Sequence, residues 1–377
     1  MNSSLKTPST KSFSTKHLFI MKIYNVLFIL LCHCLSISCV NQDDSATYRI
    51  DVSDNEARRI YAADFDSIKL ETSQNSMIYD IGDIIPYHEG YVVVGKEKAL
   101  YFRSDGTFVC RIGDKGRGEG EYLSLSSCYV YQDTIHIFSS QNKAILKYTL
   151  RDGRCEYSGK VKTPDTLSLR KIVQNDLYPN RYYCLNTYHG TGGVVPSLCI
   201  YDTDFHKVAS SSSFIKDGGM SYQYPFSSTK DGLFFTDFLS YTITELKHDS
   251  IDESRTFDFM KNNYPEECTD YTDVHDAMHR INKLDAWNRT IVTHTVKAGD
   301  YLFVGLSSGR MARYDTITGE SSVVRFMKST SEPMMYPAFL IEDGTLLLAS
   351  SASDETFDNP PVYKIPLEIF GTASHNQ

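Results

Sequence analysis

A glycine-rich stretch near residue 115 has the highest density of residues that could hold a ligand. Glycine-rich loops with basic side chains bind phosphate when a helix begins directly after them, because the helix N-terminus faces the anion. Residues 125–131 alternate as a strand does, so we predict no phosphate site. The stretch comprises Arg111, Gly113, Lys115, Gly116, Arg117, Gly118, Gly120, Glu121 and Tyr122.

A second motif could supply a nucleophile. Residues 305–309 read Gly-Leu-Ser-Ser-Gly and fit the G-x-S-x-G pattern, which requires a strand, a sharp turn and then a helix. The following residues, 310–314, read as another strand. We therefore predict a hairpin turn around Ser307 and assign no catalytic residue.

Metal ligands are sparse. His275 and His279 are four residues apart, a spacing that can hold Zn²⁺ on a helix, but the metalloprotease motif needs Glu where Asp276 stands, and a third ligand. No cysteine pair forms C-x-x-C. We predict no metal and no cofactor. The cysteines after residue 39 are expected to be small apolar residues in strands, although pairing in an exported chain remains open: Cys110, Cys128, Cys155, Cys184, Cys199 and Cys268.

The N-terminus has the order of a secretory signal. Met21-Lys22 precedes an apolar run at 26–31, and small residues lie just before Cys39. This arrangement resembles the lipobox of bacterial lipoproteins, which implies that the Cys39 thiol carries fatty acyl chains such as palmitate. We expect an N-terminal extension and signal peptide over 1–38 and a flexible acylated tether over 39–57. The alternative is an uncleaved anchor helix at 23–40.

Composition favours strands and excludes one class of partner. The 377 residues are 41% hydrophobic and include 26 Tyr and 20 Phe, which pack well on pleated sheets. The net charge is −9; because residues 1–38 hold four lysines and no acid, the chain from Cys39 has 34 basic and 47 acidic residues, or −13. Nucleic-acid binding needs clustered positive charge, so we exclude it.

A repeat organises most of the chain. Each unit has an apolar strand, a Tyr-bearing strand, an Asp- or Gly-containing turn and a further strand. Asp105, Asp152, Asp204 and Asp249 occupy matching turns, 47, 52 and 45 residues apart. Units of 40–50 residues with four short strands are typical of propellers. We predict an all-β, six-bladed β-propeller over 58–371, followed by a tail at 372–377.

Two segments lie outside the repeat. The sixth unit lacks its last strand, and the alternating segment 66–71 has no unit of its own, so we predict that it pairs with 362–367 and closes the ring. Residues 262–287, between blades four and five, have apolar residues at helical spacing and predict a helical insertion. We expect its polar residues to bind a ligand beside the channel mouth, unless the insertion only covers a blade edge: His275, His279, Arg280, Lys283 and Trp287.

The Gly-rich run ending in Glu121-Tyr122, with the Asp-Gly hairpin before it and the Ile-Lys-Leu-Glu strand at 68–71, resembles the six-bladed β-propeller lipoproteins of Bacteroidota, related to NHL-repeat propellers. In that family the run links the first two blades and usually has Pro where Glu119 stands. The resemblance implies a propeller in the cell envelope. It supplies no common catalytic set.

The sequence thus favours a non-enzymatic lipoprotein, anchored in the outer membrane, that binds or scaffolds a protein, peptide or glycan partner. The alternative is a lactonase- or lyase-like propeller enzyme with a metal in its channel. Such an enzyme needs convergent acidic and histidine side chains on the inner strands. The inner-strand segments 81–87 and 125–131 offer little beyond Asp83.

Overall fold

The computed structural model describes residues 47–53, 57–187, 197–211, 225–236, 241–269, 274–284, 286, 289–334, 338–349 and 358–371. Several predicted features lie outside these residues: the signal segment 1–38, Cys39, Trp287 and the tail 372–377. By internal contacts the chain divides into two units, 1–47 and 48–377, and the second contains the ring described below.

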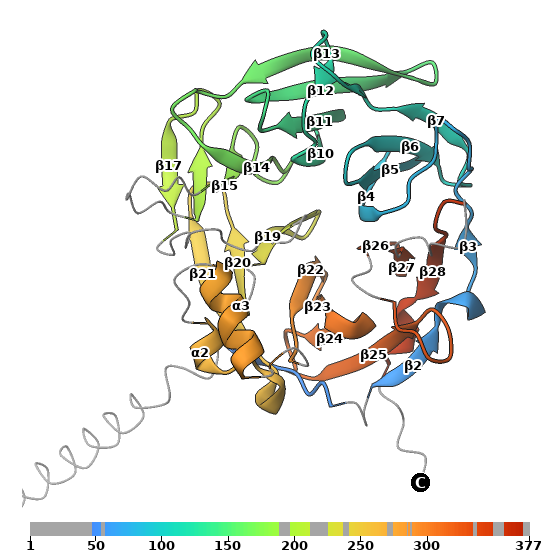
Figure 1. Ribbon diagram of the computed structural model, residues 1–377, viewed down its shortest axis with the longest axis vertical. Helices are drawn as coiled ribbons and strands as arrows, with labels where there is room; N and C mark the ends of the chain where they lie inside the picture. The colour runs from blue at the N-terminus through green and yellow to red at the C-terminus, as the bar shows by residue number, and fades with distance from the viewer. Residues whose placement is uncertain are drawn as a thin grey trace, which may run out of the picture. The chain divides into compact units, whose positions relative to one another are not determined.

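Six antiparallel sheets surround a common centre and form a six-bladed β-propeller, as predicted (Figure 1). In each blade the first strand lies nearest the centre, and later strands lie progressively further out. Blade one holds β4 (Ile81–Tyr87), β5 (Gly90–Gly95), β6 (Ala99–Arg103) and β7 (Phe108–Arg111); blade two holds β10 (Ser127–Tyr131), β11 (Thr134–Ser139), β12 (Ala144–Arg151) and β13 (Arg154–Lys162).

The other four blades repeat this order. Blade three holds β14 (Leu169–Val173), β15 (Tyr182–Asn186), β16 (Leu198–Tyr201) and β17 (Lys207–Ser210). Blade four holds β18 (Phe226–Thr229), β19 (Gly232–Thr236), β20 (Thr242–Leu246) and β21 (Ile251–Asp258). Blade five holds β22 (Val292–Ala298), β23 (Tyr301–Leu306), β24 (Arg310–Asp315) and β25 (Ser321–Met327); blade six holds β26 (Ala338–Glu342), β27 (Thr345–Ala349) and β28 (Val362–Pro366).

The Asp-containing turns join the third and fourth strands of their blades. In blade two, Asp152 and Gly153 connect β12 to β13 with φ angles of 50° and 74°. Two successive left-handed residues suit a tight hairpin, because their twist matches that of the flanking strands. This local chemistry explains why the repeat is readable in the sequence.

An N-terminal strand completes blade six, as predicted. β3 (Ser67–Ile68) pairs antiparallel with β28, placing Ile68 opposite Val362 and Ser67 opposite Tyr363. The Lys364 amide also donates to the Asp66 carbonyl at 2.7 Å. The blade therefore gains its fourth strand from a segment almost 300 residues earlier in the chain.

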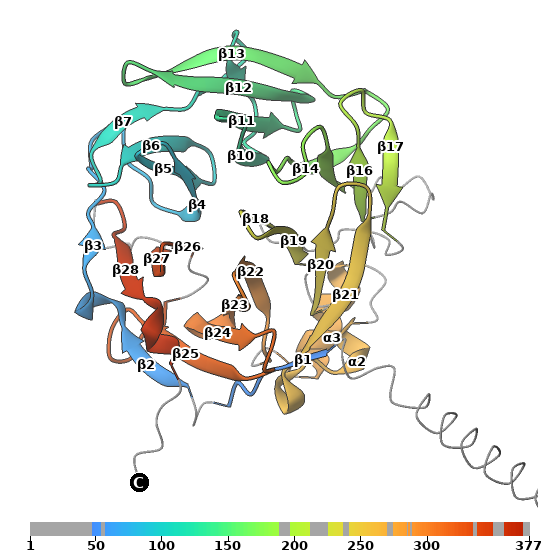
Figure 2. The same cartoon turned by 180° about the vertical axis from the view of Figure 1, so that it is seen from behind.

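Two further N-terminal strands extend neighbouring blades. β1 (Thr47–Arg49) joins the outer edge of blade four beside β21, and β2 (Arg58–Tyr61), followed by the short 3-10 helix η2 (Ala62–Asp64), pairs parallel with β25 of blade five (Figure 2). The predicted tether over 39–57 is therefore wrong from residue 47 onward. The alternating side chains of Tyr48, Ile50 and Val52 are buried, and the last two are 0% exposed.

The glycine-rich stretch links blades one and two, between β7 and β10. Its short parallel strands β8 (Asp114–Lys115) and β9 (Glu121–Tyr122) pair with each other. The Gly118 amide donates to the Glu121 carboxylate at 2.6 Å, and a Cβ at Gly116 would lie 2.0 Å from the same carboxylate oxygen. Glycine thus makes room for the Glu121 side chain, and Tyr122 is buried at 1% exposure.

The remaining glycines of this stretch also have packing roles. A Cβ at Gly113 would lie 2.4 Å from the Tyr148 hydroxyl, and Tyr148 donates that hydroxyl to the Gly120 carbonyl at 2.9 Å. The glycines therefore let the link pack closely against blade two.

The helical insertion lies between blades four and five, as predicted. It comprises the 3-10 helix η3 (Met260–Asn262), α2 (Glu266–Thr269) and α3 (Val274–Lys283). Cys268 and Ile281 are buried in one apolar cluster with residues of both blades, including Phe257 and Val292, while Leu284 stays 43% exposed. A further 3-10 helix, η5 (Ser307–Gly309), connects β23 to β24, and η6 (Leu367–Phe370) follows β28.

In the described residues, no helix combines the length and the apolar character needed to cross a membrane.

Candidate ligand-binding cavity

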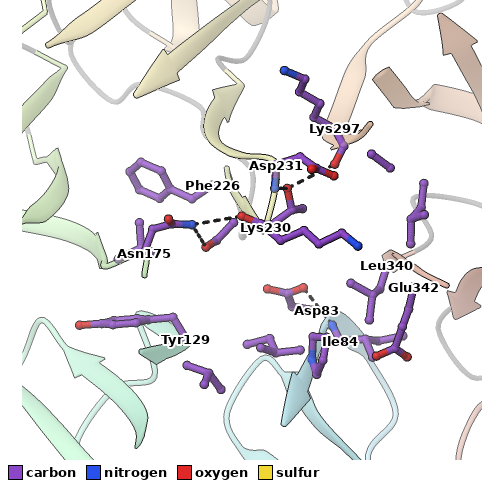
Figure 3. Close-up of a pocket in the computed structure, with 18 of the residues that line it drawn as sticks. Asp83, Ile84, Tyr129, Asn175, Phe226, Lys230, Asp231, Lys297, Leu340 and Glu342 are labelled. Carbon is purple, nitrogen blue, oxygen red and sulfur yellow. Dashed lines mark hydrogen bonds between the residues drawn. The ribbon is translucent and has the colours of Figure 1, made fainter. Parts of the chain in front are cut away.

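A cavity of about 770 Å³ occupies the centre of the ring (Figure 3). Residues from the innermost strand of every blade line it, so the site exists only when all six blades are in place. The contributing strands are β4, β10, β14, β18, β22 and β26, together with the turns that follow several of them.

Much of the cavity wall is apolar. Ile84, Tyr129, Val173, Phe226 and Leu340 line it, each from a different inner strand. All five side chains are largely buried, since their other faces pack between blades. Aromatic and aliphatic walls of this kind suit a ligand with apolar faces, such as a sugar ring or a peptide side chain.

Three acidic groups of the cavity lining already accept hydrogen bonds. Asp176 accepts from the Gln132 amide at 3.0 Å, Asp231 from the Gly299 amide at 3.0 Å, and Glu342 from the Tyr91 hydroxyl at 2.9 Å. Each of these bonds joins two different blades. These carboxylates therefore help to set the spacing of the blades around the cavity.

Asp83 is a different kind of acid. Its side chain projects from β4 into the cavity, and the Ile84 amide donates to it at 2.9 Å (Figure 3). Burial disfavours the charged form and raises the pKa of Asp83 to about 7, although the Ile84 amide and Lys171 oppose the shift. Asp83 consequently changes its protonation state near neutral pH.

Three lysines also line the cavity, and one of them is Lys297. Lys171, in β14, is 8% exposed and donates its ammonium to the Ser126 carbonyl. Burial lowers the pKa of Lys171 to about 8, assisted by Arg170 and opposed by Asp83. Lys230, in the turn after β18, extends its side chain into the open centre of the cavity (Figure 3).

One protein-family model matches most of the chain. The model described as a domain of unknown function, DUF4934, matches residues 37–359. The chain belongs to the DUF4934 family. No match was found among the curated proteins.

Three solved structures are similar to this DUF4934 protein, and the first of them shares its fold. A Bacteroides fragilis NCTC 9343 protein described as exported has 15% identity and a TM-score of 0.62, with 85% of this chain and 98% of that one covered. The extracellular domain of a Bacteroides thetaiotaomicron one-component system has 12% identity and a TM-score of 0.40. The match covers 79% of this chain and 34% of that one. PorZ, a surface component of the Porphyromonas gingivalis type-IX secretion system, has 12% identity and a TM-score of 0.36. The match covers 79% of this chain and 34% of PorZ.

The structure places the predicted binding residues of the DUF4934 protein away from the cavity. The insertion lies at the outer margin of the ring beside β21 in both views (Figures 1 and 2), and none of its described residues lines the cavity. His279 and Lys283 are exposed, while Arg280 pairs with Asp276 at 2.9 Å and donates to the Glu267 carbonyl at 2.9 Å. The expected position beside the channel mouth is therefore wrong for these residues.

The reason is that the apolar side of α3 packs in a cluster with Phe257 of β21 and Val292 at the start of β22, and no residue of this cluster lines the cavity. His275 lies in α3, but its side chain and Trp287 lie outside the described residues. A binding role for the insertion stays a prediction.

The G-x-S-x-G motif of the DUF4934 protein is a hairpin connection, as predicted. Ser307 is buried, accepts from the Ile291 amide at 3.1 Å and donates to the Arg289 carbonyl at 3.4 Å. In the part of the chain that the structure describes, no group of three His, Cys, Asp or Glu side chains has an arrangement that could hold a metal ion.

Asp83 was named from the sequence only as an acid on an inner strand, in weighing the alternative enzyme, and the lysines of the cavity were not predicted. Asp83, Tyr129 and Lys171 each occupy the third position of their inner strand, in β4, β10 and β14. Aligning the units on their first strands would have shown that these side chains share one level of the channel. Lys230 lies in a turn and has no such repeat signal.

Proposed function

We propose that this protein is a cell-envelope lipoprotein that binds a peptide or glycan ligand in its central cavity without transforming it. The observation that carries the proposal is the cavity itself. Ligand sites typically measure 300–1,000 Å³ and combine apolar walls with a few polar groups that fix orientation. The volume of about 770 Å³, the aromatic walls and the charged trio of Asp83, Lys171 and Lys230 match that description.

Blocking the cavity tests this proposal. Pro86 is exposed and lines the cavity, so Pro86→Trp places a large ring in the ligand space without removing a backbone donor. We expect at least a tenfold loss of affinity for any peptide or oligosaccharide found in a calorimetric screen of the full-length protein. Ile317→Trp is the control, because Ile317 is 75% exposed in the turn after β24. Equal affinities of both variants would place the ligand elsewhere.

The competing function is a lactonase- or lyase-like enzyme with a metal in the channel. Asp83 favours it in one respect, since a carboxyl with a pKa of about 7 can take up and release a proton near neutral pH. Elemental analysis of the purified protein separates the two functions. One equivalent of a transition metal in the wild type that is absent from Asp83→Asn would favour the enzyme.

The proposed location depends on Cys39, and replacing that residue gives a direct prediction. The signal order at residues 21–39 supports acylation of the thiol. Cys39→Ala should leave the chain without lipid, so we expect it to move from the membrane fraction to the soluble fraction, or to remain unprocessed. Incorporation of labelled palmitate should disappear as well. Unchanged membrane attachment without label would favour the uncleaved anchor at 23–40.

A further inference from the structure

Positive charge in the cavity is less fully paired than negative charge. The carboxylates of Asp176, Asp231 and Glu342 accept hydrogen bonds from neighbouring blades. Within the described residues, by contrast, the Lys230 ammonium forms no ion pair, and it extends toward the side of the cavity where Asp83 lies (Figure 3). Lys230 is an exposed residue, so its ammonium is accessible to an anion that enters the cavity.

The groups that surround Asp83 come from several inner strands. Lys171 of β14 attracts its charged form, and the thiol of Cys128 lies on β10. Lys230 approaches from the turn after β18, Lys297 from β22 and Glu342 from β26. Figure 3 shows the Lys297 ammonium pointing away from Asp83. Lys171 interacts electrostatically with Asp83, and Lys230 extends into the same cavity.

We propose that the cavity recognises a single carboxylate of its ligand, held by Lys230 and Lys171 and hydrogen-bonded by the protonated carboxyl of Asp83. The inference rests on the proposed function and deepens it by naming the ligand group. Peptide C-termini and sugar acids both carry such a group. A carboxylic acid and a carboxylate can share one proton, whereas two carboxylates repel each other.

A monoanion fits this cavity better than a phosphate does. Five acidic residues line the cavity against three lysines: Asp83, Asp176, Asp231, Glu342 and Asp343 against Lys171, Lys230 and Lys297. Repulsion from this acidic lining grows with the ligand's charge, so a doubly charged phosphate is disfavoured relative to a carboxylate.

Affinity should depend on pH in a defined direction. Below pH 7 Asp83 is protonated and donates to the ligand; as the pH rises through about 7 it becomes charged and repels the anion. Because one proton is coupled to binding, affinity falls at most about tenfold between pH 6 and pH 8. Loss of the Lys171 charge above pH 8 acts in the same direction.

The test uses paired probes that differ in one charge. The full-length protein is titrated at pH 6 with a tripeptide carrying a free or amidated C-terminus, and with galacturonate or its methyl ester. We expect one carboxylate probe to bind at least tenfold more tightly than its masked partner, which also identifies the source of the group. Inorganic phosphate should not compete.

Matched variants locate the interaction. Lys230→Met should remove at least tenfold of the affinity for the carboxylate probe, and Lys297→Met, which deletes the outward-pointing ammonium, should change it less than twofold. Asp83→Asn, an uncharged donor of the same shape, should retain binding and flatten the dependence between pH 6 and pH 8.

Three results would overturn the carboxylate inference: equal binding of free and masked probes, equal effects of the two lysine variants, or an unchanged pH profile in Asp83→Asn. Binding of masked probes that Pro86→Trp abolishes would leave the cavity as the ligand site and reject only the charge recognition. Failure of every probe to bind rejects the carboxylate inference, while the wider screen with Pro86→Trp still decides the proposed function.

Discussion

Deletion of residues 47–72 is expected to unfold the entire ring rather than a single blade. This segment supplies β1, β2 and β3, the outermost strands of blades four, five and six. It buries five aliphatic side chains, each worth about 1.5–3 kcal/mol on burial, so the loss is about 8–15 kcal/mol and equals the whole stability of an ordinary domain. These side chains are Ile50, Val52, Ile60, Ile68 and Leu70.

Circular dichroism and urea denaturation of the truncated chain provide the measurement. We expect no cooperative transition, because three sheet edges and their apolar surfaces become exposed together. Deletion of residues 41–46, which stops short of β1, is the control and should leave the transition unchanged. A truncated chain that still unfolds cooperatively would show that the N-terminal strands only decorate a ring closed by other contacts.

Substitution of Asn359 has the largest effect expected of any single residue described here. Asn359 is 7% exposed and joins the C-terminal segment to the loop after β3. Its amide nitrogen donates to the carbonyls of Glu71 and Ser76 at 2.8 and 2.9 Å, and its side-chain oxygen accepts from the Ile78 amide at 2.7 Å. One side chain thus bonds three backbone groups of one turn, although the Glu71 carbonyl also accepts from the Ser76 hydroxyl at 2.7 Å.

Asn359→Ala should lower the free energy of unfolding by about 3 kcal/mol or more, since each buried unpaired group costs about 1–3 kcal/mol. Urea denaturation at constant m-value gives the change directly. The neighbouring Asp358→Ala is the control; its side chain is exposed, so a change within about 0.5 kcal/mol is expected. A loss below 1 kcal/mol for Asn359→Ala would mean that water replaces the amide without cost.

The blades could be predicted from sequence because their signals are local. Turns such as Asp152-Gly153 recur at matching positions between strands that alternate, and counting them gives six units with one strand missing. The strand that completes the ring was identifiable because Ile68 and Leu70 alternate with polar residues and no other unit claimed them. Closure then followed from the need to cover an edge.

The other N-terminal strands could not be predicted in the same way. β2 pairs in parallel with β25, so Ile60 lies opposite Phe326, and no turn or spacing in the sequence records that pairing. β1 consists of three residues, too short for a periodic signal. The predicted tether was extended from the acidic segment before β1 to residue 57, although Ile50 and Val52 are apolar residues that can be buried.

The candidate site was harder still, because its parts lie far apart in the sequence. Asp83, Lys171 and Lys230 meet only when three inner strands surround one channel. The insertion attracted attention because it interrupts the repeat, and its apolar residues Met278 and Ile281 do pack on the blades. Their spacing does not reveal which surface they cover. The predicted binding residues were therefore expected beside the channel mouth, whereas the insertion lies at the outer margin of the ring.

The placement of the N-terminal strands also sets an order of events during folding. Ile68 meets Val362, and Ile60 meets Phe326, across 294 and 266 residues of intervening chain. Blades one to three draw all their strands from contiguous sequence and can form as the polypeptide is synthesised. Blades four to six cannot complete until the earliest segment of the domain returns to them. The first residues of the domain to be synthesised are therefore the last to find their partners, and the ring is complete only at that final step.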